Sequence, residues 1–267
     1  MPGRMHFNRR AIGDVELDIV IPVYNEGENI VGVLESLRRS VKTRFRVLIC
    51  YDHEEDTTLA ALSDYRSRDF SVSLVKNDRP GALGAVVSGF RSSSAPAVLV
   101  FPADDDYNAP RLDRLVEEFR KGCDIVVASR FMPGGCMQGA PLLKSALIHA
   151  GAIVLRHVGR LPVRDPSNGL RLFSRKVLER LPVESTAGFA YSLELLVKCH
   201  RLGWKIGEAP VAWYERKRGQ SRFKVLAWLP QYLVWVRYAL ATTLLGRGPE
   251  TVVQSPPPAV ENKRMCA

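Results

Sequence analysis

The sequence predicts an α/β fold with a mostly parallel sheet and helices on both faces. Continuous apolar, β-branched runs recur through the first half of the chain, and apolar residues at helical spacing follow each of them. Runs that are apolar at every position are typical of strands buried on both sides. Their alternation with amphipathic helices predicts a doubly wound, Rossmann-like sheet, in which ligands bind at the carboxyl ends of the strands.

Five strands and four helices are expected in this first half. Afterwards the Gly- and Pro-rich stretch 131–141 predicts a loop, residues 142–158 predict an apolar helix, and the remainder completes a second half. The expected strands are 17–24, 46–51, 71–76, 97–103 and 124–129, and the helices lie at about 30–37, 57–68, 80–90 and 112–121.

A chain of 267 residues has room for one large domain. We expect a flexible N-terminus over 1–16, the domain over 17–224, an amphipathic segment over 225–245 and a disordered tail over 246–267. The amphipathic segment contains Pro230 and Arg237. A transmembrane helix needs roughly 20 uninterrupted apolar residues. We therefore expect this segment to lie at a membrane surface, and the alternative is a surface helix packed on the domain.

Composition narrows the class of protein. Hydrophobic residues make up 46% and charged residues 25%, which is typical of globular proteins. The net charge of +10 indicates polyanionic partners: nucleic acid, an anionic membrane or phosphorylated substrates. No nucleic-acid-reading motif accompanies the charge, so we expect no nucleic acid partner. Five scattered cysteines and the lack of an apolar run near the N-terminus predict a cytoplasmic protein.

Polar residues follow the first two expected strands. The motif IPVYNE places Pro22, Tyr24 and Glu26 at the end of the first, where a nucleoside base could stack on the ring and bond the carboxylate. Asp52 ends the second, where it could bind a ribose or a base edge. The alternative for both groups is helix capping, by Asn25 and Glu26 in one case and by the acids after Tyr51 in the other.

Three consecutive acids, Asp104, Asp105 and Asp106, follow the fourth expected strand. Asp104 and Asp106 could together hold Mg²⁺ or Mn²⁺, with diphosphate oxygens and water as the other ligands. The alternative is a solvated turn, in which Asp is also common.

Four arginines are candidates for binding phosphate oxygens through their planar guanidinium groups. Lys217 and Lys224, in the same basic motif as two of them, are expected on a solvated face. The candidates are Arg130, Arg171, Arg216 and Arg222.

The motifs taken in order resemble those of one enzyme family. They are IPVYNE, Asp52 with Asp56-Thr57, PADDD, ASRFMPGG, RDPSNGLRLF, GFAYSLELL and ERKRGQSRFK, and they run from about 17 to 224. This arrangement is similar to that of the inverting GT-A glycosyltransferases of the dolichol-phosphate mannose synthase and polyprenyl-phosphate glycosyltransferase type, in glycosyltransferase family 2. Pro102 stands where the family often has a further Asp.

The resemblance implies a GT-A fold and a role for each candidate. A sugar, mannose or glucose, would pass with inversion from a nucleoside diphosphate to a polyprenyl or dolichyl phosphate. The acceptor oxygen would be the nucleophile, and the enzyme would be peripheral on the cytosolic face of a membrane. By this resemblance the nucleotide is bound by Pro22, Tyr24, Glu26, Asp52, Ala103, Arg216 and Arg222, and the metal is held by Asp104 and Asp106. Arg130 and Arg171 contact phosphates and, with the two metal ligands, are the catalytic residues. Asp165, Asn168 and Glu194 lie at the acceptor side.

Two alternatives stay open. The same chemistry on a soluble hydroxyl acceptor would need a carboxylate as general base, for which Asp165 or Glu194 would serve. A non-catalytic protein that binds nucleotide sugars or nucleic acid is the other.

Overall fold

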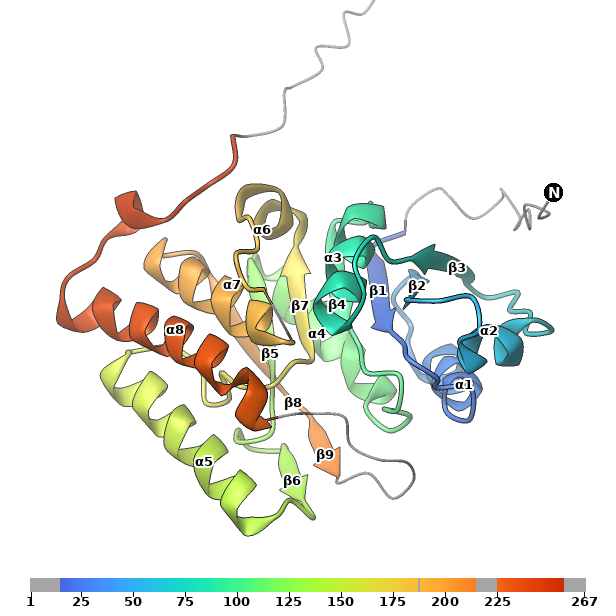
Figure 1. Ribbon diagram of the computed structural model, residues 1–267, viewed down its shortest axis with the longest axis horizontal. Helices are drawn as coiled ribbons and strands as arrows, with labels where there is room; N and C mark the ends of the chain where they lie inside the picture. The colour runs from blue at the N-terminus through green and yellow to red at the C-terminus, as the bar shows by residue number, and fades with distance from the viewer. Residues whose placement is uncertain (1–14, 187, 215–224, 257–267) are drawn as a thin grey trace, which may run out of the picture.

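The computed structural model describes residues 15–186, 188–214 and 225–256, without the side chains of 143–144 and 225–228. Its main sheet has seven strands in the order β3-β2-β1-β4-β7-β5-β8 (Figure 1). All neighbours are parallel except β7, which runs antiparallel to both β4 and β5. The mostly parallel sheet is thus confirmed. The strands are β1 (Leu17–Pro22), β2 (Phe45–Tyr51), β3 (Ser71–Lys76), β4 (Ala97–Val100), β5 (Ile125–Ser129), β7 (Arg171–Ser174) and β8 (Ile206–Pro210).

Helices cover both faces of the sheet. Alternate residues of β1 point to opposite sides, because Ile19 lies in the buried cluster with α1 and α4, whereas Val20 lies in the cluster with α3 and α7. The charged residue within β1, Asp18, is fully buried and neutralised by two hydrogen bonds of 2.8 Å from Arg46. The helices are α1 (Ile30–Ser40), α2 (Thr57–Leu62), α3 (Ala82–Ser92), α4 (Leu112–Arg120), α5 (Leu142–Ile153), α6 (Arg175–Arg180), α7 (Ala190–Arg201) and α8 (Val225–Leu244).

The parallel register brings the loops after β1, β2 and β4 to one edge of the sheet. Pro22 pairs with Cys50 at the end of β1 and β2, and Val20 pairs with Val100 at the end of β4. The polar residues that follow these strands therefore share one end of the molecule, as the sequence predicts.

Two local expectations are wrong. Helix α2 ends at Leu62 instead of about residue 68. The expected loop 131–141 contains a short strand, β6 (Cys136–Gln138), which pairs with β9 (Ala212–Tyr214) in a separate two-stranded sheet. The Gly-rich composition of this stretch predicts a loop. The strand forms there because it pairs with a partner more than 70 residues away in the sequence.

Helix α8 packs across α7 and the π-helical turn η3 (Val154–Val158) (Figure 1). Trp235 is buried, and its indole N–H donates to Ser185 Oγ at 2.8 Å. Part of the expected disordered tail is ordered, because η4 (Pro249–Thr251) follows α8 and Val252 is buried against the core. Within the described ranges, no helix is both long and apolar enough to cross a bilayer.

Candidate functional site

The loop after β1 is fastened to the start of α2. Asn25 has a φ of +54°, which asparagine tolerates better than most residues. Its backbone N–H donates to Asp56 Oδ1 at 3.0 Å, and its side chain accepts from the Thr57 N–H at 3.1 Å. Asp56 also caps α2 through the Thr58 N–H at 2.9 Å, so the capping alternative holds for this acid. These bonds hold the IPVYNE loop in one conformation.

The aromatic ring of this loop faces solvent. Tyr24 is 46% exposed, and His53 packs edge-on against it with the ring centroids 5.4 Å apart. Glu26 lies two residues on, and its Oε2 accepts from Asn29 Nδ2 at 2.7 Å. The sheet edge therefore presents an aromatic ring that a planar base can stack on.

Asp52 connects the loop after β2 to the loop before α3. Its Oδ1 accepts from Asn77 Nδ2 at 2.6 Å, and its Oδ2 accepts from the Gly81 N–H at 2.9 Å. Gly81 needs to be glycine because its φ is +91°. A carboxylate has about four acceptor sites, so Asp52 retains capacity for a ribose hydroxyl or a base N–H.

The three acids after β4 have different environments. Asp105 is buried and accepts from the Asn108 backbone at 2.8 Å and from Asn108 Nδ2 at 2.6 Å. Burial raises the pKa of Asp105 to about 6, against the opposing effect of these hydrogen bonds. Asp104 is half-buried and Asp106 is exposed. Asp105 therefore fixes the loop and leaves its two neighbours at the edge of the sheet.

Asp104 and Asp106 fit a divalent ion whose coordination is completed by substrate. In the part of the chain that the structure describes, no group of three or more His, Cys, Asp or Glu side chains could hold a metal by itself. Mg²⁺ at nucleotide sites is usually bound by one or two carboxylates, with phosphate oxygens and water supplying the rest. Ser36 Oγ donates to the Asp106 carbonyl at 2.5 Å and so anchors this loop on α1.

Arg130 and Asp165 form a buried ion pair. Arg130 Nε lies 2.6 Å from Asp165 Oδ2 and Arg130 Nη2 lies 2.8 Å from Oδ1, and the Asp165 side chain is fully buried. Burial acts to raise the pKa of Asp165, but the hydrogen bonds and charge of Arg130 outweigh it, and the pKa is lowered. Asp165 as a general base stays a prediction, which its burial and its ion pair with Arg130 do not favour. Arg130 retains Nη1, which faces Met137 Sδ at 3.7 Å.

Arg171 and Glu194 are fully buried. The predicted roles of Arg171 at the phosphates and of Glu194 at the acceptor side stay predictions that this burial does not favour. Arg171 donates to the carbonyl oxygens of Ser192, Pro166 and Asn168, and burial lowers its pKa to about 10. Glu194 accepts from Lys198 Nζ at 2.7 Å and from the Glu184 and Ser185 N–H groups. Asn168 is half-buried, and its Oδ1 accepts from the Leu170 N–H at 3.1 Å.

The sequence did not reveal the role of two residues after the acids. Asn108 binds both the N–H and the carbonyl of Ala212, at 2.9 and 2.8 Å, and so joins the acidic loop to β9. Tyr107 packs edge-on against Tyr214, with the ring centroids 4.9 Å apart. The only sign of these roles in the sequence is that Tyr107 and Asn108 directly follow the three acids. Arg216 and Arg222 fall in 215–224, outside the described residues.

The family model described as "Glycosyl transferase family 2" matches residues 18–182. The chain belongs to glycosyl transferase family 2. The predicted resemblance is thus confirmed, and the chain is a glycosyltransferase. The matched part contains β1 to β7 and the loops that carry Tyr24, Asp52, Asp104 and Asp106.

Two curated relatives of this glycosyltransferase are named for lipid phosphates. The dolichol-phosphate mannosyltransferase of Pyrococcus furiosus is 26% identical over 216 residues, which are 79% of this chain and 60% of that protein. The undecaprenyl-phosphate mannosyltransferase of Micrococcus luteus is 28% identical over 209 residues, which are 76% of this chain and 85% of that one. The chain thus spans less than two thirds of the archaeal relative.

Solved structures of a glucosyl-3-phosphoglycerate synthase share the fold. Glucosyl-3-phosphoglycerate synthase from Mycobacterium tuberculosis in complex with UDP is 19% identical to this glycosyltransferase, with a TM-score of 0.63. The match covers 88% of this chain and 86% of that one. Another structure of that enzyme contains Mn²⁺, UDP and phosphoglyceric acid. This likeness confirms the GT-A fold.

Proposed function

We propose that this glycosyltransferase moves a sugar, mannose or glucose, from a nucleoside diphosphate to a polyprenyl phosphate with inversion at the anomeric carbon. The observation that carries the proposal is the shared sheet edge, where hydrogen-bonded loops present Tyr24, Asp52, Asp104 and Asp106 together. The names of the two mannosyltransferase relatives support the acceptor class.

In this proposal each loop has one task. Tyr24 stacks on the base, Pro22, Glu26 and Ala103 shape the nucleoside pocket, and Asp52 accepts from ribose or base. Asp104 and Asp106 hold Mg²⁺ or Mn²⁺, which when bound neutralises the departing diphosphate. Arg130, through its remaining Nη1, and Arg216 and Arg222 in the undescribed segment are proposed to contact phosphates. Asn168 is proposed to lie at the acceptor side.

The buried carboxylates favour a phosphate acceptor over a hydroxyl. A hydroxyl needs a general base within hydrogen-bond reach, and the two predicted bases, Asp165 and Glu194, are fully buried and already bonded. A phosphate oxygen is already anionic, so it can attack without a base. The soluble acceptor of glucosyl-3-phosphoglycerate synthase remains the second candidate class, because that enzyme shares the fold.

Acceptor competition tests the proposal. The purified chain, with Mn²⁺ and a panel of nucleotide sugars, would receive a short polyprenyl phosphate or 3-phosphoglycerate, and products would be identified by mass spectrometry. We expect a glycosylated polyprenyl phosphate with one or more donors. Consumption of 3-phosphoglycerate without any glycolipid would contradict the lipid acceptor while leaving the transferase intact.

Base stacking gives the first mutational prediction. Tyr24→Ala should raise the dissociation constant of the donor nucleotide about tenfold, because stacking on an aromatic ring contributes roughly 1–3 kcal/mol per base. Tyr24→Phe keeps the ring and should bind almost as wild type. Isothermal titration of nucleoside diphosphates checks both variants, and equal affinity of Tyr24→Ala and wild type would contradict the assignment.

Peripheral membrane contact through residues 225–245 is part of the proposal. Helix α8 buries Trp235 and Ala239 on the domain, but Leu229, Leu233 and Val234 remain 42 to 52% exposed. An apolar face on a helix already packed on its other side is typical of helices that lie in a bilayer interface. The expected position is the cytosolic face of a membrane.

Leu233→Glu tests this contact without disturbing the core. Binding to lipid vesicles should fall severalfold, because a charge replaces an exposed apolar side chain at the interface. The matched control is Leu74→Glu on the edge strand β3, since Leu74 is 45% exposed and Leu233 is 46% exposed. Co-sedimentation with vesicles measures both, and an equal loss in the two variants would contradict a specific contact.

A further inference from the structure

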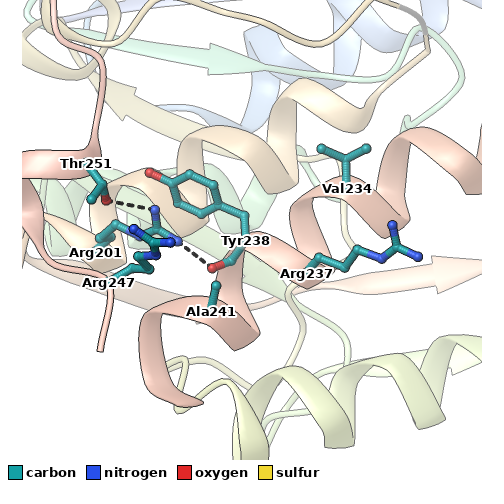
Figure 2. A pocket seen from close by; sticks show the side chains of 7 residues that line it. All are labelled: Arg201, Val234, Arg237, Tyr238, Ala241, Arg247 and Thr251. Carbon is teal, nitrogen blue, oxygen red and sulfur yellow. Dashed lines mark hydrogen bonds between the residues drawn. The ribbon is translucent and has the colours of Figure 1, made fainter. Parts of the chain in front are cut away.

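A hollow of about 480 Å³ lies where the end of α7, the outer part of α8 and the chain after α8 meet (Figure 2). It lies outside the donor loops, and the function proposed above gives it no task. Three arginines and four less polar residues line it. The lining residues are Arg201, Val234, Arg237, Tyr238, Ala241, Arg247 and Thr251.

Arg201 is fixed in this hollow with part of its donor capacity unused. It donates from Nε to Thr242 Oγ1 at 2.9 Å, from Nη1 to Thr251 Oγ1 at 3.0 Å and from Nη2 to the Tyr238 carbonyl at 2.6 Å. Its guanidinium also stacks on the Tyr238 ring, 3.3 Å from the centroid. A guanidinium has five N–H donors, so the second hydrogens of Nη1 and Nη2 remain.

Arg247 brings a second guanidinium to the same end of the hollow, and Arg237 reaches away at the other end (Figure 2). Burial lowers the pKa of Arg201, and the charge of Arg247 lowers it further. Among the described residues, no carboxylate forms an ion pair with Arg237 or Arg247. The acid close in sequence, Glu250, favours the charged form of Arg201 weakly, and its Oε1 accepts from the Gly248 N–H at 3.2 Å.

We propose that this hollow binds a phosphate group, held by the paired guanidinium groups of Arg201 and Arg247. The like charges of Arg201 and Arg247 repel, and Glu250 offsets this repulsion only weakly. An oxyanion between the two guanidinium groups would relieve the repulsion while accepting the spare donors. Arg is suited to this task because its planar fork matches phosphate oxygens. Arg237 supplies further positive charge from the opposite end.

Two sources could supply the phosphate: a lipid headgroup or a soluble phosphate compound. The exposed apolar residues around the hollow favour a lipid headgroup, and this choice rests on the membrane contact proposed above. Val234 lines the hollow and is 52% exposed, and Leu245, two residues before Arg247, is 70% exposed. The arginines therefore lie beside the exposed apolar face of α8, as expected for cations at the level of lipid phosphates.

The test compares Arg247→Gln with a matched control, Arg39→Gln. Arg39 is exposed in the last turn of α1, away from the hollow, so its replacement lowers the net charge equally. The soluble probe is glycerol 1-phosphate, followed by titration calorimetry. The membrane probe is a phosphatidylcholine vesicle with and without phosphatidylglycerol, followed by co-sedimentation. Neither the calorimetry nor the co-sedimentation contains a sugar donor or a metal. A negative result in these experiments is therefore distinguishable from failure of the proposed transferase function.

We expect Arg247→Gln to weaken glycerol 1-phosphate binding and phosphatidylglycerol-dependent vesicle binding about fivefold, since a basic residue at a membrane surface contributes on the order of this factor. Arg39→Gln should match wild type. Weaker glycerol 1-phosphate binding with unchanged vesicle binding would uphold the site and assign it to a soluble compound. The proposal is overturned if the two variants behave alike with both probes. Nucleotide affinity, which should be equal in both variants, checks that they are folded.

Discussion

Asp104→Asn should lower the rate of sugar transfer about a thousandfold at saturating donor. A divalent ion contributes several kcal/mol to stabilising charge on a leaving diphosphate, and about 4 kcal/mol corresponds to that factor in rate. Asp104 lies in the loop that the buried Asp105 fixes, so the substitution removes a charge from the metal site without breaking the hydrogen bonds to Asn108. Asp106→Asn should act in the same direction. Steady-state turnover over a range of Mn²⁺ concentrations measures both effects.

The matched control for these variants is Asp64→Asn. Asp64 is an exposed acid just after α2, a helix that follows β2 and not β4, and it should be dispensable. A metal role also predicts that more Mn²⁺ is needed for half-maximal activity in Asp106→Asn. Full metal-dependent turnover in both site variants would show that the metal, if required, binds elsewhere.

Arg130→Met should destabilise the folded protein by about 3–5 kcal/mol, because it leaves the fully buried Asp165 charge without its partner. The same change at Arg164, whose side chain is 41% exposed and lies 3.3 Å from Glu208, should cost no more than about 1 kcal/mol. Urea denaturation at neutral pH gives the free energy of unfolding for both variants.

The double variant Arg130→Met with Asp165→Leu separates structure from chemistry. Replacing both members of a buried ion pair by apolar residues is often close to neutral for stability, so part of the lost free energy should return. The remainder is the cost of the buried Arg130 backbone N–H, which loses Asp165 Oδ2 as its acceptor. If sugar transfer stays low in the stable double variant, Arg130 also contacts substrate, as the second hydrogen of its Nη1 allows. A stability loss below about 1 kcal/mol in Arg130→Met would contradict the structural role.

The parallel half of the fold could be predicted because most residues of its strands are apolar, although β1 contains Asp18 and β3 alternates Ser with apolar residues. Strand β3 has the predicted bounds, 71–76, and the ends of β1 and β2 lie within two residues of the predicted ends. Strand β7 could not be predicted in this way. It has four residues and lies antiparallel between β4 and β5, so its place depends on partners that are distant in sequence. Because β7 was not predicted, nothing in the sequence indicated that Arg171 would lie in the sheet.

The donor side of the site could be predicted better than the acceptor side. Tyr24, Asp52 and Asp104 follow strands whose parallel arrangement brings their ends together, so their neighbourhood follows from topology. Asp165 and Glu194 were predicted at the acceptor side, as possible general bases. Their burial depends on Arg130 and Lys198, and in the first pair the partners are 35 residues apart. A charged residue gives no local sign of a partner at that distance.

The most direct test of the account is the effect of metal on nucleotide binding. Isothermal titration of UDP into the wild-type chain would be performed with Mn²⁺ and again with EDTA, and repeated on Asp104→Asn with Asp106→Asn. We predict that EDTA weakens UDP binding by the wild type about tenfold or more, since Asp104 and Asp106 would hold the ion and its positive charge would attract the diphosphate. The double variant should bind weakly in both conditions. Equal wild-type affinity with and without metal would contradict the account.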